Sequence, residues 1–269
     1  MINRLVISAD EKTYFKEYLK IVVEAWKKFF PEVKISLAFV TSEKSINPAF
    51  LEIDNLEVTN FPIIRNLPIA NQAKMARHYL ACSYGEEIVS IEDIDTIPMQ
   101  RQWFEEKFSK RIKETILFVG KDVYEGTGHE GKCPISTMTA ESFLFKAMIN
   151  PKNLDYEEFI ESLVGLRVYD DKEDVSVLNF SDESTIRALS KNKNIKFTEI
   201  NRNVDVKVDW IDRSWWSIDE QKMKKLGYVT CNFLRPFSSN FSKIQPVVEF
   251  IFEKQKSPSS TIFKLKERK

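Results

Sequence analysis

A short apolar segment that runs directly into acidic residues is the feature that most constrains this chain. The segment Ile88–Ile91 is rich in β-branched residues, and Glu92, Asp93 and Asp95 follow it before Pro98 breaks the run. Such a segment is typical of a buried strand in a parallel sheet. Ligands of these sheets bind outside the carboxyl ends of the strands. The sequence therefore predicts an α/β fold with a ligand site immediately after this strand.

Asp93 and Asp95 are the first candidate metal ligands. They are two residues apart, so their carboxylates share one face of a continuing strand or converge in a tight turn. Two carboxylates this close repel each other unless a divalent cation such as Mg²⁺ or Mn²⁺ lies between them. An acidic turn exposed to solvent is the alternative, and it is the more frequent meaning of an isolated Asp-x-Asp. The apolar strand favours the metal site.

The composition limits the class of protein. The chain has 269 residues, of which 43% are hydrophobic, enough for one large globular domain. Its 40 basic and 40 acidic residues give no net charge, which argues against a nucleic-acid-binding protein. The three cysteines form no Cys-x-x-Cys pair, which indicates free thiols in a reducing compartment, and no apolar run reaches transmembrane length. We therefore expect a cytoplasmic protein without a transmembrane segment.

Hydrophobic periodicity predicts alternating strands and helices. Strands at 4–8 and 34–41 flank a helix at 11–30, for which Asp10 is the expected N-cap, and together they form a βαβ unit. The further predicted elements are helices at 70–84, 103–108, 140–149, 156–164 and 182–191 and a strand at 115–119. The segments without a clean period, expected to be irregular or mixed loop and strand, are 43–69 and 206–241.

Two basic residues precede the acidic strand. Lys74 and Arg77 are three residues apart and share one face of the predicted helix. They are either solvated cations, the usual fate of such a pair, or partners for an aspartate or a substrate phosphate. The glycine-rich segment 126–131 matches G-x-G-x-x-G, but charged residues precede it and Pro134 follows. This context predicts a mobile loop and excludes a dinucleotide-binding turn.

The order of these features resembles the nucleotide-sugar-dependent glycosyltransferases of the GT-A fold. A first strand is followed by Asp10, a long helix and a second strand, and then residues 71–77 (NQAKMAR) precede the apolar strand that ends in Asp93-Ile94-Asp95. The similarity covers residues 1–120 and continues more weakly through 132–136 and 181–183. Asp-x-Asp alone has low specificity, so the ordered set carries the resemblance.

The resemblance implies a mostly parallel central sheet flanked by helices. It implies one domain at residues 1–254, with a Rossmann-like half for the donor nucleotide at 1–120 and an acceptor-binding half at 121–254. The basic segment 255–269 is then a tail, for which we expect a peripheral contact with membranes.

The resemblance also implies the donor-binding residues. The nucleotide-diphosphate sugar would be bound by Ser8 and Asp10 on the first βα elements, by Lys74 and Arg77 on the helix, and by Asp93.

The metal and the acceptor site follow from the same resemblance. Asp93 and Asp95 would hold Mn²⁺ or Mg²⁺ against the diphosphate. Many members have a third ligand, often histidine, near the carboxyl end, but no histidine follows His129 here, so an aspartate (Asp205, Asp209 or Asp212) or water would take its place. The acceptor would be a glycan or another compound with a hydroxyl group, and Asp182 and Glu183 are the candidate bases. Their alternative role is to cap the helix that they begin.

Two other classes of protein remain open from the sequence. A phosphohydrolase of the haloacid dehalogenase type also has an apolar strand ending in Asp-x-Asp, although its motif normally follows the first strand and is preceded by no βαβ unit. A non-catalytic nucleotide-binding protein on the GT-A fold is the other. Release of phosphate from a phosphomonoester would indicate the first, and nucleotide binding without turnover would indicate the second.

Overall fold

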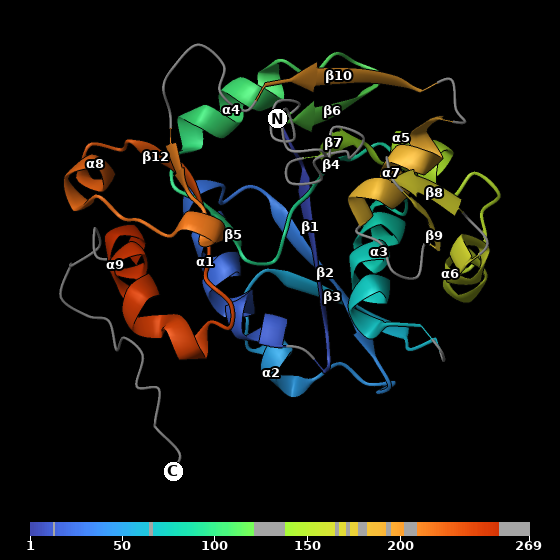
Figure 1. The fold of residues 1–269 in the computed structure, drawn as a ribbon, viewed down its shortest axis with the longest axis horizontal. Coiled ribbons are helices and arrows are strands. Elements are labelled where there is room, and N and C mark those ends of the chain that lie inside the picture. The colour runs from blue at the N-terminus through green and yellow to red at the C-terminus, as the bar shows by residue number, and fades with distance from the viewer. Residues whose placement is uncertain are drawn as a thin grey trace.

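The computed structural model describes residues 1–12, 14–64, 67–120, 138–164, 167–170, 173–176, 182–191, 195–201 and 209–252. A seven-stranded sheet runs through the centre (Figure 1). In spatial order its strands are β10 (Lys196–Ile200), β6 (Thr115–Val119), β7 (Met138–Glu141), β4 (Ile88–Ile91), β1 (Arg4–Asp10), β2 (Lys34–Thr41) and β3 (Leu56–Pro62). Only β7 pairs antiparallel with its neighbours, so the mostly parallel sheet predicted from the sequence is confirmed.

Helices cover both faces of this sheet, so its central strands are almost entirely buried. In β1, Leu5 and Ile7 pack into one core cluster and Val6 packs into the other, as the alternation of a strand requires. The first cluster is completed by α1 (Leu19–Phe29), α4 (Arg101–Ser109), α8 (Glu220–Lys224) and α9 (Phe241–Phe252). The second is completed by α3 (Ile69–Ala81), α5 (Ser142–Ile149), α6 (Tyr156–Val164) and α7 (Asp182–Lys191).

The predicted helix at 11–30 differs from the observed structure at its start. Strand β1 continues to Asp10, a 3-10 helix η1 follows at Tyr14–Tyr18, and the α-helix begins only at Leu19. The carboxylate of Asp10 accepts a hydrogen bond from the backbone N–H of Lys12 at 2.9 Å, which stabilises the turn after the strand. The prediction that Asp10 caps the helix is therefore wrong.

Three strands of the central sheet were not predicted. The segment expected to be irregular contains β3 and the short helix α2 (Pro48–Leu51). β3 is an edge strand whose side chains are mostly half exposed, so its sequence has no continuous apolar run. Strand β7 occupies the start of the predicted helix at 140–149, and β10, the other edge strand, was also missed.

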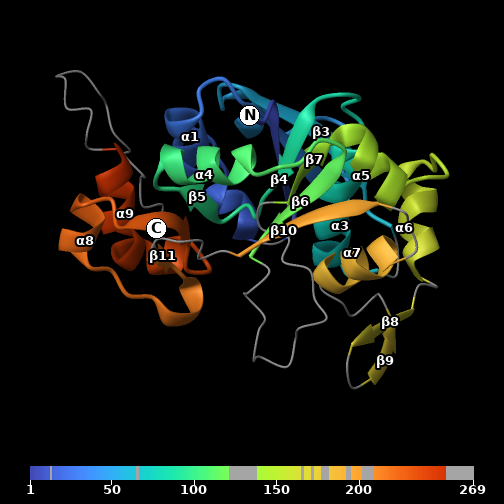
Figure 2. The same cartoon turned by 90° about the horizontal axis from the view of Figure 1, so that it is seen from above.

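A smaller sheet joins the acidic segment to the carboxyl-terminal part of the chain. Its order is β11 (Asp209–Ile211), β12 (Tyr228–Asn232) and β5 (Thr96–Pro98), and β5 begins directly after Asp95. The backbone N–H of Phe233 donates to the carbonyl oxygen of Asp95 at 2.9 Å. Figure 2 shows the carboxyl-terminal elements α8, α9 and β11 at the opposite end of the molecule from α6.

Several remaining features complete the described structure. A separate two-stranded hairpin is formed by β8 (Arg167–Asp170) and β9 (Glu173–Ser176), and two further 3-10 helices are η4 (Arg213–Trp215) and η5 (Ser238–Asn240). Among the described helices, none has the length and apolar character needed to span a bilayer. The glycine-rich segment 126–131 and the tail 255–269 lie outside the described residues, and the division into two halves at residue 120 stays a prediction.

Candidate functional site

One pocket lies where β1 ends and α3 begins. It encloses about 390 Å³ of empty space, part of it open to solvent. All five residues that the resemblance implied for donor binding line it: Ser8, Asp10, Lys74, Arg77 and Asp93. The other lining residues are Ala9, Phe15, Ala70, Ala73, Ile94 and Arg235. Ser8, Asp10 and Asp93 meet because β1 and β4 are parallel neighbours, so their carboxyl ends share one edge of the sheet. Helix α3 packs against β1 and brings Lys74 and Arg77 to the same edge.

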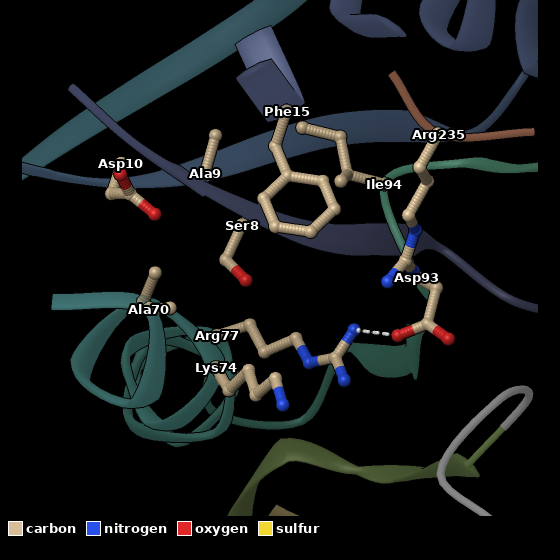
Figure 3. A pocket seen from close by; sticks show the side chains of 11 residues that line it. Ser8, Ala9, Asp10, Phe15, Ala70, Lys74, Arg77, Asp93, Ile94 and Arg235 are labelled. Carbon is tan, nitrogen blue, oxygen red and sulfur yellow. Dashed lines mark hydrogen bonds and ion pairs between the residues drawn. The ribbon is translucent and has the colours of Figure 1, made fainter. Parts of the chain in front are cut away.

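Arg77 connects α3 to the acidic segment. Its guanidinium Nη1 donates to Oδ1 of Asp93 at 2.7 Å and to the backbone carbonyl of Glu92 at 2.8 Å (Figure 3). The side chain of Arg77 is 5% exposed, and that of Asp93 is 30% exposed. Arg77 is thus a buried cation with a fixed direction, and the reading of Lys74 and Arg77 as a merely solvated pair does not hold for Arg77.

Asp95 lies in a different environment from Asp93. Its side chain has no exposed surface, and its Oδ2 accepts from Nη1 of Arg213 at 3.0 Å and from Nε of Arg235 at 2.5 Å. Burial raises the pKa of the nearby Cys231 thiol well above its usual value, and the charge of Asp95 raises it further, so this thiol stays neutral. Asp95 is thus completely buried and paired with two arginines, and it does not belong to the residues that line the pocket.

Arg235 links the two environments. Besides pairing with Asp95 it lines the pocket, and Figure 3 shows its side chain entering from the side opposite to α3. Its guanidinium carbon lies 4.8 Å from the centre of the Phe15 ring. Sequence reasoning missed both Arg235 and Phe15. Arg235 is 140 residues from Asp95 along the chain, and only the pairing of β12 with β5 brings them together.

The aspartates fit a divalent cation in part. Asp93 lines the pocket, and Oδ1 of Asp95 is a buried oxygen without a hydrogen-bond partner among the described residues. Carboxylate oxygens are the ligands that Mg²⁺ and Mn²⁺ prefer. Within the described ranges, however, no three His, Cys, Asp or Glu side chains are grouped closely enough to form a metal site. Water and donor phosphates would have to complete the coordination.

Two of the candidate third ligands have local partners: Asp209 pairs with Lys222, and Asp212 accepts from the backbone N–H of Ser214 at 2.8 Å. Asp212 nevertheless lies near Asp95, because besides burial the charges of both aspartates raise the pKa of the Cys231 thiol. Asp205 lies outside the described residues. Asp182 and Glu183 are the first two residues of α7, and their side chains are likewise outside the description, so their catalytic role stays a prediction.

Neither a protein-family model nor a curated protein matches this sequence. Similarity to known proteins is found in the fold. The solved galactosyltransferase LgtC, in complex with donor and acceptor sugar analogues, matches over 92% of this chain and 95% of its own, with a TM-score of 0.50 and 12% identity. This chain has the GT-A glycosyltransferase fold.

A second solved structure, the glycosyltransferase GlyE of Streptococcus pneumoniae, matches over 74% of this chain and 45% of that one, with a TM-score of 0.46 and 12% identity. At 12% identity, the likeness to LgtC shows the fold alone.

Proposed function

We propose that this chain is a glycosyltransferase that moves a sugar from a nucleotide-diphosphate sugar to a hydroxyl group of an acceptor. The observation that carries the proposal is the pocket itself: in a GT-A fold, Lys74, Arg77 and Arg235 converge from α3 and from the carboxyl-terminal part on the carboxyl end of β1 and β4. Three cations around one hollow suit a diphosphate, whose charge they would neutralise.

The other lining residues suit the nucleoside part of such a donor. Phe15 offers an apolar ring face, and Ser8 and Asp10 offer polar oxygens at the end of β1. Asp10 is completely buried, so a ligand group that donates to it would be held in a fixed direction. We infer that the nucleoside lies toward β1 and the diphosphate toward α3.

We further propose that Asp93 and Asp95 hold Mn²⁺ or Mg²⁺ when the donor is bound. The cation would supply Lewis-acid stabilisation for the nucleoside diphosphate that leaves. The protein's own contribution is to hold Asp93 through Arg77 and to fix Asp95 between two arginines. The oxygen of Asp95 without a described partner supports this assignment.

The acceptor is proposed to be a glycan or another hydroxyl compound. An inverting transfer needs a carboxylate that takes the hydroxyl proton, and Asp182 or Glu183 is the candidate. A contact of the basic tail with membranes and a cytoplasmic location stay predictions from the sequence.

The acceptor side is tested by Asp182→Asn and Glu183→Gln. If one of them is the base, that variant loses most transfer activity and keeps donor binding. If both only cap α7, each costs about 1 kcal/mol of stability and leaves transfer near the wild-type rate. Transfer assays and melting temperatures on the same preparations separate the two roles.

The donor class is tested by a thermal-shift screen of UDP, GDP, CMP and dTDP sugars with and without Mn²⁺. Ligand stabilisation grows as RT ln(1 + [L]/Kd), so weak binders become visible at high concentration. We expect at least one nucleotide sugar to raise the melting temperature and to be turned over. Release of phosphate from a phosphomonoester, with no effect of any nucleotide sugar, would instead support a phosphohydrolase.

A further inference from the structure

One wall of the pocket is built from two segments that are far apart in the sequence. Phe15 belongs to η1, and Arg235 follows β12, yet the Arg235 guanidinium carbon lies 4.8 Å from the centre of the Phe15 ring. Figure 3 shows both side chains across the pocket from α3. A ligand that touches both side chains therefore needs the two segments to keep a fixed relative position.

Two consecutive residues of η1 tie it to the segment around Arg235. The Tyr18 hydroxyl donates to the backbone carbonyl of Leu234 at 2.6 Å, and this carbonyl belongs to the peptide bond that joins Leu234 to Arg235. The Glu17 carboxylate accepts from the backbone N–H of Ser238 at 2.8 Å, at the start of η5. The backbone is thus held on both sides of Arg235.

Aromatic packing keeps the Tyr18 hydroxyl aimed at the Leu234 carbonyl. Tyr18 is completely buried, and its ring stacks on that of Phe233 at a centroid distance of 6.2 Å and meets the Phe237 ring edge-on at 5.4 Å. Both phenylalanines belong to the segment that carries Arg235. A ring that is packed in this way offers its hydroxyl in one direction, so the hydrogen bond is formed before a ligand arrives.

We propose that Glu17 and Tyr18 are positioning residues for the donor: they hold residues 234–238 against η1, so that Phe15 and Arg235 form one preformed wall of the pocket. A wall that is ordered in the free protein lowers the entropic cost of binding. Glu17 and Tyr18 are not among the described residues that line the pocket, so they act through this wall. The inference rests on the proposed function, because the ligand is taken to be a nucleoside diphosphate.

The test compares Tyr18→Phe and Glu17→Ala with wild type by calorimetry with UDP, GDP and dTDP. Tyr18→Phe keeps the ring and loses only the hydroxyl, and Glu17→Ala changes an exposed side chain. For the nucleotide that wild type binds, we expect Kd to rise about fivefold in Tyr18→Phe and about threefold in Glu17→Ala, through a less favourable binding entropy. Glu17→Gln, whose amide oxygen accepts the same hydrogen bond, should stay within about twofold of wild type.

Two readouts separate positioning from a general loss of stability. Tyr228→Phe is the matched control, because this buried hydroxyl also bonds to the backbone, accepting from the N–H of Asp219 at 3.1 Å beside α8. We expect a similar drop in melting temperature from this variant and no loss of affinity. Hydrogen exchange at the backbone N–H groups of Phe233 and Ser238, both hydrogen-bonded in the free protein, should be faster in Tyr18→Phe and should match wild type once the nucleotide is bound.

The remaining outcomes overturn the proposal. Unchanged nucleotide affinity in either Tyr18→Phe or Glu17→Ala removes the positioning role and leaves the donor site standing. An equal loss of affinity in Tyr228→Phe does the same, because affinity would then only follow stability. If Tyr18→Phe does not fold, Glu17→Ala decides alone. If wild-type protein binds none of the three nucleotides, the proposed function fails, and the inference fails with it.

Discussion

Two clusters of charged side chains lie at opposite ends of the central sheet and have opposite compositions. At the amino end of the strands, the buried Arg4 donates to Glu87 at 2.6 Å and also pairs with Glu57, while Lys34 pairs with Glu87 at 3.2 Å. At the carboxyl end, the buried Asp95 accepts from Arg213 and Arg235. The first cluster surrounds a cation with acids, and the second surrounds an anion with cations.

The two clusters differ in whether one of their members also lines the pocket. The amino-end cluster balances two bases with two acids, and the Tyr84 ring covers the Arg4 guanidinium at 4.0 Å. No described pocket-lining residue belongs to it. In the carboxyl-end cluster two arginines share the buried carboxylate of Asp95, and one of them, Arg235, also lines the pocket. Charged side chains that pair only with one another hold strands together, whereas an arginine that also lines a pocket is placed to bind an anionic ligand.

We expect the largest effect from a substitution that breaks the amino-end cluster. Arg4→Met leaves Glu57 and Glu87 without their shared partner and removes the hydrogen bond to Ser36. We expect a loss of about 3 kcal/mol in the free energy of unfolding, while the folded fraction keeps its affinity for a nucleoside diphosphate. Urea unfolding and calorimetry measure the two quantities. Weakened nucleotide binding at unchanged stability would reverse the assignment of the two clusters.

Arg77→Lys tests the ion pair between Arg77 and Asp93 at the carboxyl end of the sheet. Lysine keeps the charge but cannot bond both Asp93 and the Glu92 carbonyl with the fixed geometry of a guanidinium. We expect the turnover of a nucleotide sugar to fall about 30-fold, equal to about 2 kcal/mol. Steady-state kinetics measure this loss, and Arg101→Lys on the surface is the control. Wild-type rates in Arg77→Lys mean that the pair with Asp93 has no role in the reaction.

Asp93→Asn tests the metal assignment. The side chain is partly exposed, so the amide should fold normally, whereas replacing the fully buried Asp95 would also leave two arginines facing each other. We expect the affinity for a nucleoside diphosphate in Mn²⁺ to fall about tenfold, or about 1.4 kcal/mol, and the difference between Mn²⁺ and EDTA to shrink. Equal response to Mn²⁺ in the variant and wild type would remove Asp93 from the metal site.

The smallest expected effect is the pH dependence of the amino-end cluster. The hydrogen bond from Arg4 holds the pKa of Glu87 below its ordinary value of 4.5. A carboxyl with a lowered pKa stabilises the fold above its unfolded pKa, and this contribution is lost as the pH falls through the folded value. Glu87→Gln should therefore be less stable than wild type at pH 7, and the gap should narrow below about pH 4.5. A gap that is constant down to pH 3 would contradict this.

The local sequence pattern was sufficient to predict the bounds of some helices and strands. β2, α6 and α7 have the predicted bounds. The five residues that the resemblance implied for donor binding line one pocket, and their role stays a prediction. The half-exposed edge strand β3 and the short antiparallel β7 were missed, since neither has a strand-like apolar run that stands alone.

The arginine partners of Asp95 could not be predicted from local pattern. They lie 118 and 140 residues away along the chain, and their approach depends on the pairing of β12 with β5. A two-carboxylate motif read from sequence also cannot show that Asp93 is partly exposed while Asp95 is completely buried. Burial and counter-charge, which decide what each carboxylate can bind, are properties of the packed molecule.

We propose above that the pocket at the carboxyl end of the sheet binds the diphosphate of a nucleotide sugar. A crystal structure with the nucleoside diphosphate that stabilises the protein most, grown with Mn²⁺, tests it directly. We expect density for the diphosphate between Lys74, Arg77 and Arg235, with the base near Phe15 and anomalous signal from Mn²⁺ at Asp93. A nucleotide bound at the amino end of the sheet near Arg4, or anywhere outside this pocket, would show that the pocket is not the donor site.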